Sequence, residues 1–166
     1  MNRYLNLVTL IAGLWWSSVL FSWSDISDAH TDGISFELTG AEISQTLVLT
    51  PAIVILVSLI ARYRKIPRQI MIFAAVVAGW SGYLAVNLNP AASPAAIAEL
   101  EKLTGVASTV GIAQNSIAPV IYMTLALLVT AFSLIVAFRK PGEKISASLP
   151  SNEEPTDPKS LWDSQN

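Results

Sequence analysis

Four long apolar stretches alternate with polar segments along the chain, and each is long enough for a membrane-spanning helix. A helix needs roughly 20 predominantly apolar residues to cross about 30 Å of hydrocarbon. The middles of the four stretches contain no Asp, Glu, His, Lys or Arg. The pattern therefore predicts an all-α integral membrane protein with four transmembrane helices, at residues 4–22, 40–63, 69–88 and 117–138.

Start and break signals refine the second and fourth spans. Thr39 followed by Glu42 is a capping-box pattern, which places the start of the second helix near Gly40. Pro51 lies inside that helix and predicts a kink, because proline removes one backbone hydrogen bond. Pro119 falls in the first turn of the fourth span, where proline is tolerated.

The segment between the third and fourth spans predicts a short helix of its own. Ser93 can cap it, Pro94 suits the first helical position, and Gly105 can end it. Ile97, Leu100 and Leu103 lie near one face, which predicts a helix resting on the membrane surface or on the bundle. No β-strand is expected anywhere in the chain.

The charges of the connecting segments predict the orientation. Lys and Arg accumulate on the cytoplasmic side of membrane proteins. Residues 23–40 contain no Lys or Arg and residues 89–116 contain a single lysine, whereas basic residues occur before the first span, between the second and third, and after the fourth. We expect a multi-pass plasma membrane protein with both termini in the cytoplasm. The basic residues that flank the spans on the expected cytoplasmic side are Arg3, Arg62, Arg64, Lys65, Arg68, Arg139, Lys140 and Lys144.

Composition agrees with an integral membrane protein and limits the kinds of chemical site that the chain can form. The 166 residues are 52% hydrophobic and 13% charged, against about 25% charged residues in soluble domains. The net charge of −2 gives no reason to expect a nucleic-acid partner. With no cysteine and one histidine, we expect no metal, no cofactor and no enzymatic activity. The acidic segment 28–33 resembles the start of a calcium loop, but Thr39 stands where its bidentate glutamate belongs.

Composition changes after the fourth span. Residues 141–166 are rich in Pro, Ser, Asp and Glu and predict a disordered cytoplasmic tail, which leaves residues 1–140 as the membrane domain. Trp162 near the end of this tail is either a docking element or incidental.

Small residues predict a packing face on the third span. Ala74, Ala78 and Gly82 recur every four residues, with Gly79 beside them. Small residues at this spacing let helices approach closely. We therefore expect a helix–helix contact here, and we predict a working unit of at least a dimer with Gly79 and Gly82 near this contact.

A second face of the third span carries Trp80, Tyr83 and Asn87. Residues three and four apart share one side of a helix. These side chains are candidates for a substrate-binding wall, with two rings to stack on an aromatic ligand and one amide to form a hydrogen bond. The alternative is that Tyr83 and Asn87 are anchors at the membrane interface and that Trp80 packs on a neighbour.

Three of the five tryptophans lie in residues 15–23. Trp15 and Trp16 point about 100 degrees apart on a helix, so the two rings cannot face one ligand. We expect at least one of them to fill space between helices or to face lipid.

Four features of the sequence belong together: the stretch Leu38-Thr39-Gly40-Ala41-Glu42, the run Arg62-Tyr63-Arg64-Lys65, Trp23 and the late 157–163 segment. In these features the chain resembles the tryptophan-associated transmembrane proteins of actinobacteria. These are small four-span proteins encoded beside tryptophan biosynthesis genes. Some members are described as tryptophan-specific permeases, so the resemblance implies a membrane protein tied to tryptophan metabolism with tryptophan as a ligand. The alternative is a non-transporting accessory or assembly subunit that binds another membrane protein.

Overall fold

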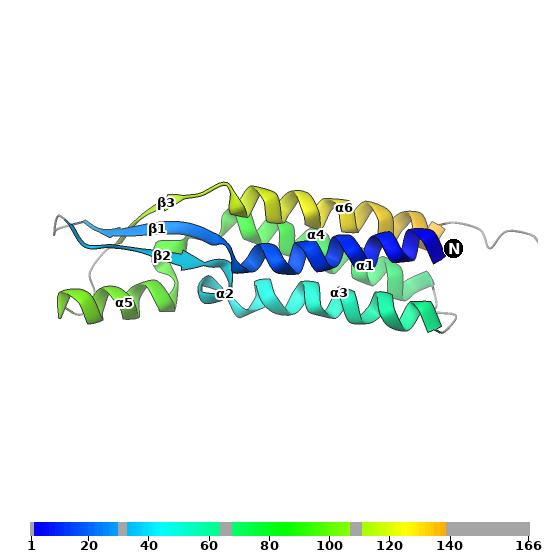
Figure 1. Ribbon diagram of the computed structural model, residues 1–166, viewed down its shortest axis with the longest axis horizontal. Coiled ribbons are helices and arrows are strands. Elements are labelled where there is room, and N and C mark those ends of the chain that lie inside the picture. Colours follow the sequence, from blue (N-terminus) through cyan, green and yellow to red (C-terminus); the bar gives the residue numbers. More distant parts are fainter. Residues whose placement is uncertain (1, 30–32, 64–67, 107–110, 139–166) are drawn as a thin grey trace, which may run out of the picture.

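Four long helices lie side by side in a computed structural model that describes residues 2–29, 33–63, 68–106 and 111–138 (Figure 1). They are α1 (Asn2–Ser17), α3 (Gln45–Tyr63), α4 (Arg68–Asn87) and α6 (Ala118–Phe138). Each packs against two others, in the cyclic order α1, α3, α4, α6, and neighbours run in opposite directions. By length and composition, α4 and α6 can cross a membrane, while the apolar parts of α1 and α3 are shorter.

The first apolar stretch does not stay helical to Ser22, as its hydrophobicity predicts. Helix α1 ends at Ser17 and continues as one 3-10 turn, η1 (Ser18–Leu20). The Ser17 hydroxyl donates to the Leu14 carbonyl at 2.8 Å, and the Ser18 hydroxyl donates to the Trp15 carbonyl at 2.7 Å. Because these hydroxyls satisfy carbonyls of the last turn, the helix can end here without leaving them unpaired.

The second apolar stretch is two helices, not one from residue 40 to residue 63. A single turn, α2 (Gly40–Ile43), is followed by Ser44 in an extended conformation, and α3 begins at Gln45. The predicted start is confirmed: the Glu42 carboxylate accepts hydrogen bonds from the Thr39 backbone N–H and hydroxyl, both at 2.8 Å.

A three-stranded antiparallel sheet extends from one end of the bundle, which corrects the all-α expectation (Figure 1). Its strands are β1 (Ser22–Asp28), β2 (Ser35–Thr39) and β3 (Gly111–Asn115), with β1 in the centre. Ile26 pairs with Phe36 on one side and with Ala113 on the other. We call this end of the molecule the sheet end and the opposite one the N-terminal end.

The short helix between the third and fourth spans is present as α5 (Pro94–Thr104), preceded by the 3-10 turn η2 (Pro90–Ala92). Its predicted ends are confirmed, since the Ser93 hydroxyl accepts from the Ala96 N–H at 3.1 Å and Gly105 adopts a positive φ of 71°. Its buried face differs from the expected one: Ala96 and Leu100 are buried, whereas Ile97 and Leu103 are exposed. The helix therefore packs beside the sheet, where Leu100 comes close to Gly111.

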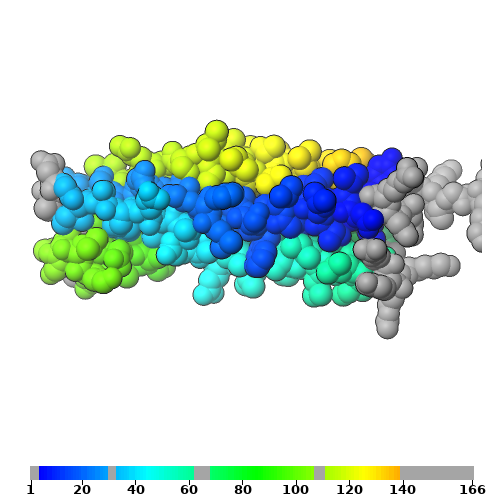
Figure 2. Space-filling view, in the orientation of Figure 1, coloured from blue at the N-terminus to red at the C-terminus, as the bar shows by residue number. Residues whose placement is uncertain are grey.

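The bundle and the sheet form one elongated body. Figure 2 shows α1 and α3 side by side on one face, with β1 and α5 continuing beyond the bundle at the sheet end. The predicted disordered tail, residues 141–166 with Trp162, lies outside the described residues.

The bundle has polar hydroxyls among its buried residues and large apolar side chains on its outside. Serine and threonine side chains from all four helices or their ends are buried, while many leucine, isoleucine, valine and phenylalanine side chains of the same helices are exposed. The buried hydroxyl residues of the bundle are Ser18, Thr50, Ser58, Ser81 and Ser133, and examples of the exposed apolar residues are Leu7, Leu10, Leu14, Leu49, Ile53, Leu56, Phe73, Val76, Leu127 and Ile135.

Candidate functional site

The residues of the 38–42 motif meet Trp23 where the bundle joins the sheet. The Trp23 indole is buried, and its Nε1–H donates to the Ser18 carbonyl at 3.0 Å. A Cβ on Gly40 would lie 2.5 Å from an indole carbon of Trp23. Glycine is therefore required sterically at position 40, and Glu42 caps the turn that presents it. The motif is first of all a structural joint between α2 and β1.

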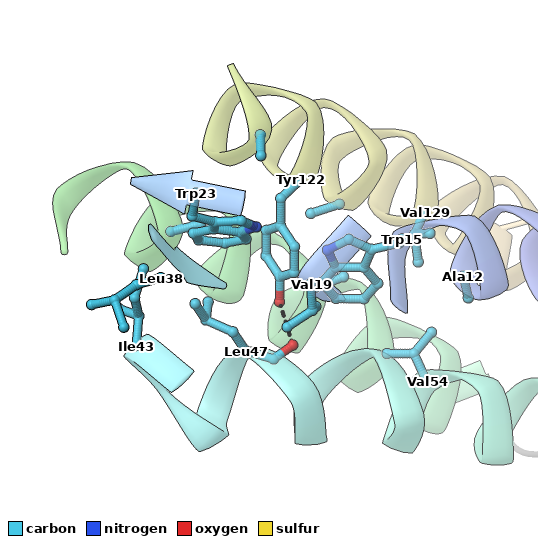
Figure 3. Packing of buried hydrophobic residues seen from close by; sticks show 14 of the residues in the cluster. Ala12, Trp15, Val19, Trp23, Leu38, Ile43, Leu47, Val54, Tyr122 and Val129 are labelled. Carbon is cyan, nitrogen blue, oxygen red and sulfur yellow. Dashed lines mark hydrogen bonds between the residues drawn. The ribbon is translucent and has the colours of Figure 1, made fainter. Parts of the chain in front are cut away.

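Three aromatic rings form a column inside the bundle beneath this joint (Figure 3). The Tyr122 ring of α6 lies between two indoles: its centroid is 5.2 Å from that of Trp23 in an edge-on arrangement and 5.3 Å from that of Trp15. All three side chains are fully buried. Tilted and edge-on contacts of this kind are the favourable geometries for aromatic pairs.

The Tyr122 hydroxyl reaches a backbone carbonyl that Pro51 leaves open. In a regular helix the Leu47 carbonyl accepts from the N–H four residues later, but that residue is Pro51, which has no N–H. The Tyr122 hydroxyl donates to the Leu47 carbonyl oxygen at 3.0 Å instead (Figure 3). A side chain of α6 thus supplies the hydrogen bond that the proline removes from α3.

Two more hydroxyls complete a neutral cluster around Tyr122. The Ser81 oxygen is 2.7 Å from the Tyr122 oxygen and 2.7 Å from the Thr50 oxygen. The Thr50 hydroxyl donates to the Thr46 carbonyl at 2.9 Å and the Tyr122 hydroxyl donates to the Leu47 carbonyl, so the Ser81 proton is the one left to bridge the two oxygens. This hydroxyl cluster (Thr50, Ser81, Tyr122) joins α3, α4 and α6 without a charged group.

The adjacent tryptophans of α1 separate as their helical spacing predicts. Trp15 is fully buried in the aromatic column, whereas Trp16 is 44% exposed. Trp23, the third tryptophan of this stretch, lies in β1 and is buried.

The candidate binding wall of Trp80, Tyr83 and Asn87 lies on the outward face of α4. Trp80 is 61% exposed and Tyr83 57% exposed, and their ring centroids are 5.8 Å apart. The Asn87 amide donates to the Tyr83 carbonyl at 2.8 Å within the same helix. The three side chains share one face, as their spacing predicts, but this face is separate from the aromatic column. Their role in substrate binding stays a prediction.

The small-residue face of α4 packs on α6 within the chain. Ala74 and Ala78 are buried. A Cβ on Gly82 would lie 3.0 Å from the Ala126 Cβ, and one on Gly79 would lie 3.6 Å from the Thr130 hydroxyl oxygen. The close helix contact expected for these residues is made between α4 and α6 within one chain. A homodimer that uses Gly79 and Gly82 stays a prediction.

A cavity of about 120 Å³ opens at the sheet end, between the last turn of α4 and the first turn of α6. Most of its lining is apolar, and Trp23 contributes to it. Polar groups come from the end of β3 and the residue that follows it. Residues of these elements that line it include Ala85, Val86, Asn115, Ser116, Pro119 and Val120.

Sequence reasoning missed the hydroxyl cluster and the place of Tyr122. Ser81 has no polar residue at helical spacing, and the polar residue at helical spacing from Thr50 is Thr46, which is not part of the cluster, so no local pattern identifies the group. The available signal was Pro51: its missing N–H leaves the Leu47 carbonyl in need of a donor. Within the part of the chain that the structure describes, no group of three or more His, Asp or Glu residues could hold a metal ion.

Comparisons with known proteins found no match for the chain. No protein-family model, no curated protein sequence and no solved structure matches the chain.

Proposed function

We propose that all four long helices span the plasma membrane, with both termini in the cytoplasm and the sheet and α5 outside. The main support is the exposed apolar surface, which covers α1 and α3 as well as α4 and α6. Soluble monomers rarely expose contiguous apolar patches larger than a few hundred Å². The shorter apolar lengths of α1 and α3 suit this placement if the bilayer boundary at the sheet end lies near Ser18 and Gln45.

The distribution of charge supports the same orientation. Asp25, Glu37 and Glu101 belong to β1, β2 and α5 at the sheet end. At the N-terminal end, the Arg68 guanidinium lies 4.1 Å above the Phe138 ring and links the start of α4 to the end of α6. Positive residues gather on the cytoplasmic side, which favours the N-terminal end as the inner one.

Within this placement, we propose that the protein carries tryptophan across the membrane. The observation that supports this is the environment of Tyr122: an aromatic ring sits between two indoles, and neutral hydroxyls satisfy its polar group. A substrate indole has the same needs, namely ring faces to pack against and one hydrogen-bond partner for its N–H. The bundle interior thus offers aromatic faces and neutral hydroxyl groups, which are the kinds of contact that an indole needs, without a buried charge.

The test is uptake of labelled tryptophan by vesicles that contain the purified protein. Thr50→Val and Ser81→Ala remove one hydroxyl each from the hydroxyl cluster and change side-chain volume little. Each should slow uptake several-fold at matched protein levels. Thr124→Val is the matched control, because the Thr124 hydroxyl is exposed and bonds only to the Val120 carbonyl of its own helix. Parent protein that moves no more tryptophan than empty vesicles would refute the transport function.

A second candidate function is that of an accessory subunit, and the outer sheet is the observation that favours it. Strands β2 and β3 are both edge strands of the sheet, and edge strands present unpaired backbone groups to another chain. Under this function, vesicle uptake is absent, and photocrosslinkers placed on β2 join the protein to one specific membrane partner in cells.

A further inference from the structure

The cavity at the sheet end has edges that belong to the outward apolar surface. Val86 of α4 and Val120 of α6 line the cavity and are 41% and 50% exposed. Trp23, which is only 1% exposed, also lines the cavity. A group that enters between the two helices from the surrounding bilayer therefore meets apolar side chains and Trp23.

The lining offers nothing to an ionic group. No charged side chain contributes to it. The first turn of α6 has already used its N–H groups: Ala118 donates to the Ser116 hydroxyl oxygen, and Val120 and Ile121 both donate to the Ile117 carbonyl. Pro119 has no N–H to give. A carboxylate or phosphate would lose its hydration here without a replacement.

Of the two polar residues in the lining, Asn115 can donate to an uncharged ligand, because the Ser116 hydroxyl already donates to the Ser22 carbonyl at 2.7 Å. Asn115 ends β3, lines the cavity and is exposed. Its side-chain amide can donate a hydrogen bond to a neutral acceptor such as an ester carbonyl. The cavity thus combines an apolar interior with a neutral hydrogen-bonding group on the sheet side.

We propose that this cavity binds the upper part of a fatty acyl chain of an outer-leaflet phospholipid, with the first methylene groups beside Trp23 and the ester carbonyl near Asn115. The proposal rests on the membrane placement proposed above. The hydrocarbon chain packs against the apolar lining, and the ester carbonyl accepts a hydrogen bond from Asn115. The charged headgroup stays outside in water.

Quenching by brominated lipids tests this directly, because bromine quenches tryptophan fluorescence on contact. A variant with Trp16→Phe, Trp80→Phe and Trp162→Phe retains only the buried Trp15 and Trp23. In vesicles of phosphatidylcholine brominated on the carbons nearer the headgroup, its fluorescence should fall relative to unbrominated vesicles. Adding Trp23→Phe should remove most of this quenching.

Filling the cavity should have the same effect as removing Trp23. Ala85 is buried and lines the cavity, so Ala85→Leu should exclude the chain and abolish most of the quenching. Ala85→Val is a milder filling variant, in case the leucine disturbs folding. The control variant retains Trp80 and Trp15 alone; because Trp80 is 61% exposed on α4, it should be quenched with or without Ala85→Leu.

Two outcomes overturn the lipid site, and a third overturns the membrane placement on which it rests. If Trp80 is quenched and Trp23 is not, no acyl chain enters the cavity. If Trp23 is quenched by aqueous acrylamide and lipid bromine has no effect, the cavity takes a water-soluble molecule instead. If Trp80 also escapes quenching by lipid bromine, the membrane placement itself fails, which separates that failure from a failure of the lipid site.

Discussion

The Tyr122 hydroxyl and the Leu47 carbonyl are 3.0 Å apart, at the one point of α3 where Pro51 has removed the helical donor. A proline in one helix and a tyrosine in another thus form one structural unit. An unpaired carbonyl in hydrocarbon is costly in free energy. This hydrogen bond offsets that cost, so α3 can contain the proline, and it also links α6 to α3.

Removing that donor should destabilise the bundle. Tyr122→Phe keeps the ring of the aromatic column but leaves the Leu47 carbonyl without its partner, at a cost of about 1–3 kcal/mol. The measurement is the free energy of unfolding in mixed micelles. Thr124→Val, which removes an exposed hydroxyl, is the control and should change stability little. Equal stabilities of the two variants would mean that the hydrogen bond to Leu47 does not stabilise the fold.

Gly40 should tolerate no side chain while Trp23 is present. The Cβ of Gly40→Ala would overlap the Trp23 indole, and overpacking of this kind costs about 1–3 kcal/mol. Gly13→Ala is the matched control: nothing lies within 4 Å of its added Cβ, and alanine in a helix interior gains about 0.5–1 kcal/mol over glycine. Thermal unfolding should therefore shift in opposite directions. Partial rescue of Gly40→Ala by Trp23→Phe would identify the indole as the clash.

The contact between α4 and α6 should distinguish two neighbouring glycines. Gly82→Ala brings its Cβ to 3.0 Å from the Ala126 Cβ, whereas Gly79→Ala leaves 3.6 Å to Thr130. We expect Gly82→Ala to lower stability by about 1 kcal/mol and Gly79→Ala to be neutral or stabilising. Both effects should be independent of protein concentration, because the contact lies within one chain. A concentration-dependent loss would instead indicate that these glycines face a second copy.

The natural absence of cysteine allows a direct test of orientation. A membrane-impermeant thiol reagent added to intact cells should label Glu101→Cys on α5, since the proposed orientation puts this helix outside. Lys65→Cys, between the second and third spans, should be labelled only after the membrane is permeabilised. Labelling of Lys65→Cys in intact cells would reverse the proposed orientation.

The parts of the fold that local signals describe were predictable from the sequence. The start of α5 follows from Ser93 and Pro94 and its end from Gly105, and the limits of α4 and α6 follow from runs of apolar residues. Each of these signals acts over one or two helical turns. A single sequence contains all the information that such elements need.

The sheet was missed although part of its signal was visible. Phe36 and Leu38 alternate with polar residues in β2, which is the period of a strand. The serine-rich β1 lacks such a pattern, and its pairing with β3 joins residues far apart in the chain, such as Ser24 and Asn115. The prediction from hydrophobicity alone also placed the end of the first helix beyond Ser17. Hydrophobicity contains no information on hydrogen bonds from serine hydroxyls that can end a helix.

The candidate site was likewise predictable from the sequence only in part. Helical spacing was enough to separate Trp15 from Trp16 and to place Trp80, Tyr83 and Asn87 on one face. It could not show that Tyr122 would meet Thr50 and Ser81, because partners on three different helices are chosen by tertiary packing. Neutral hydroxyls carry no charge pattern that would mark them as a group.

The central position of β1 sets the order in which the molecule can be completed during synthesis. Ser27 and Ile112, which face each other across β1 and β3, are 85 residues apart in the chain, and α3, α4 and α5 are made between them. Until β3 emerges, one edge of β1 has no partner, although β2 follows it almost at once. Pairing with β3 also draws the start of α6 to the end of α1. The third strand and α6, which closes the ring of helices, can therefore be added only late in synthesis, and a ribosome-bound chain that ends before residue 111 should lack both.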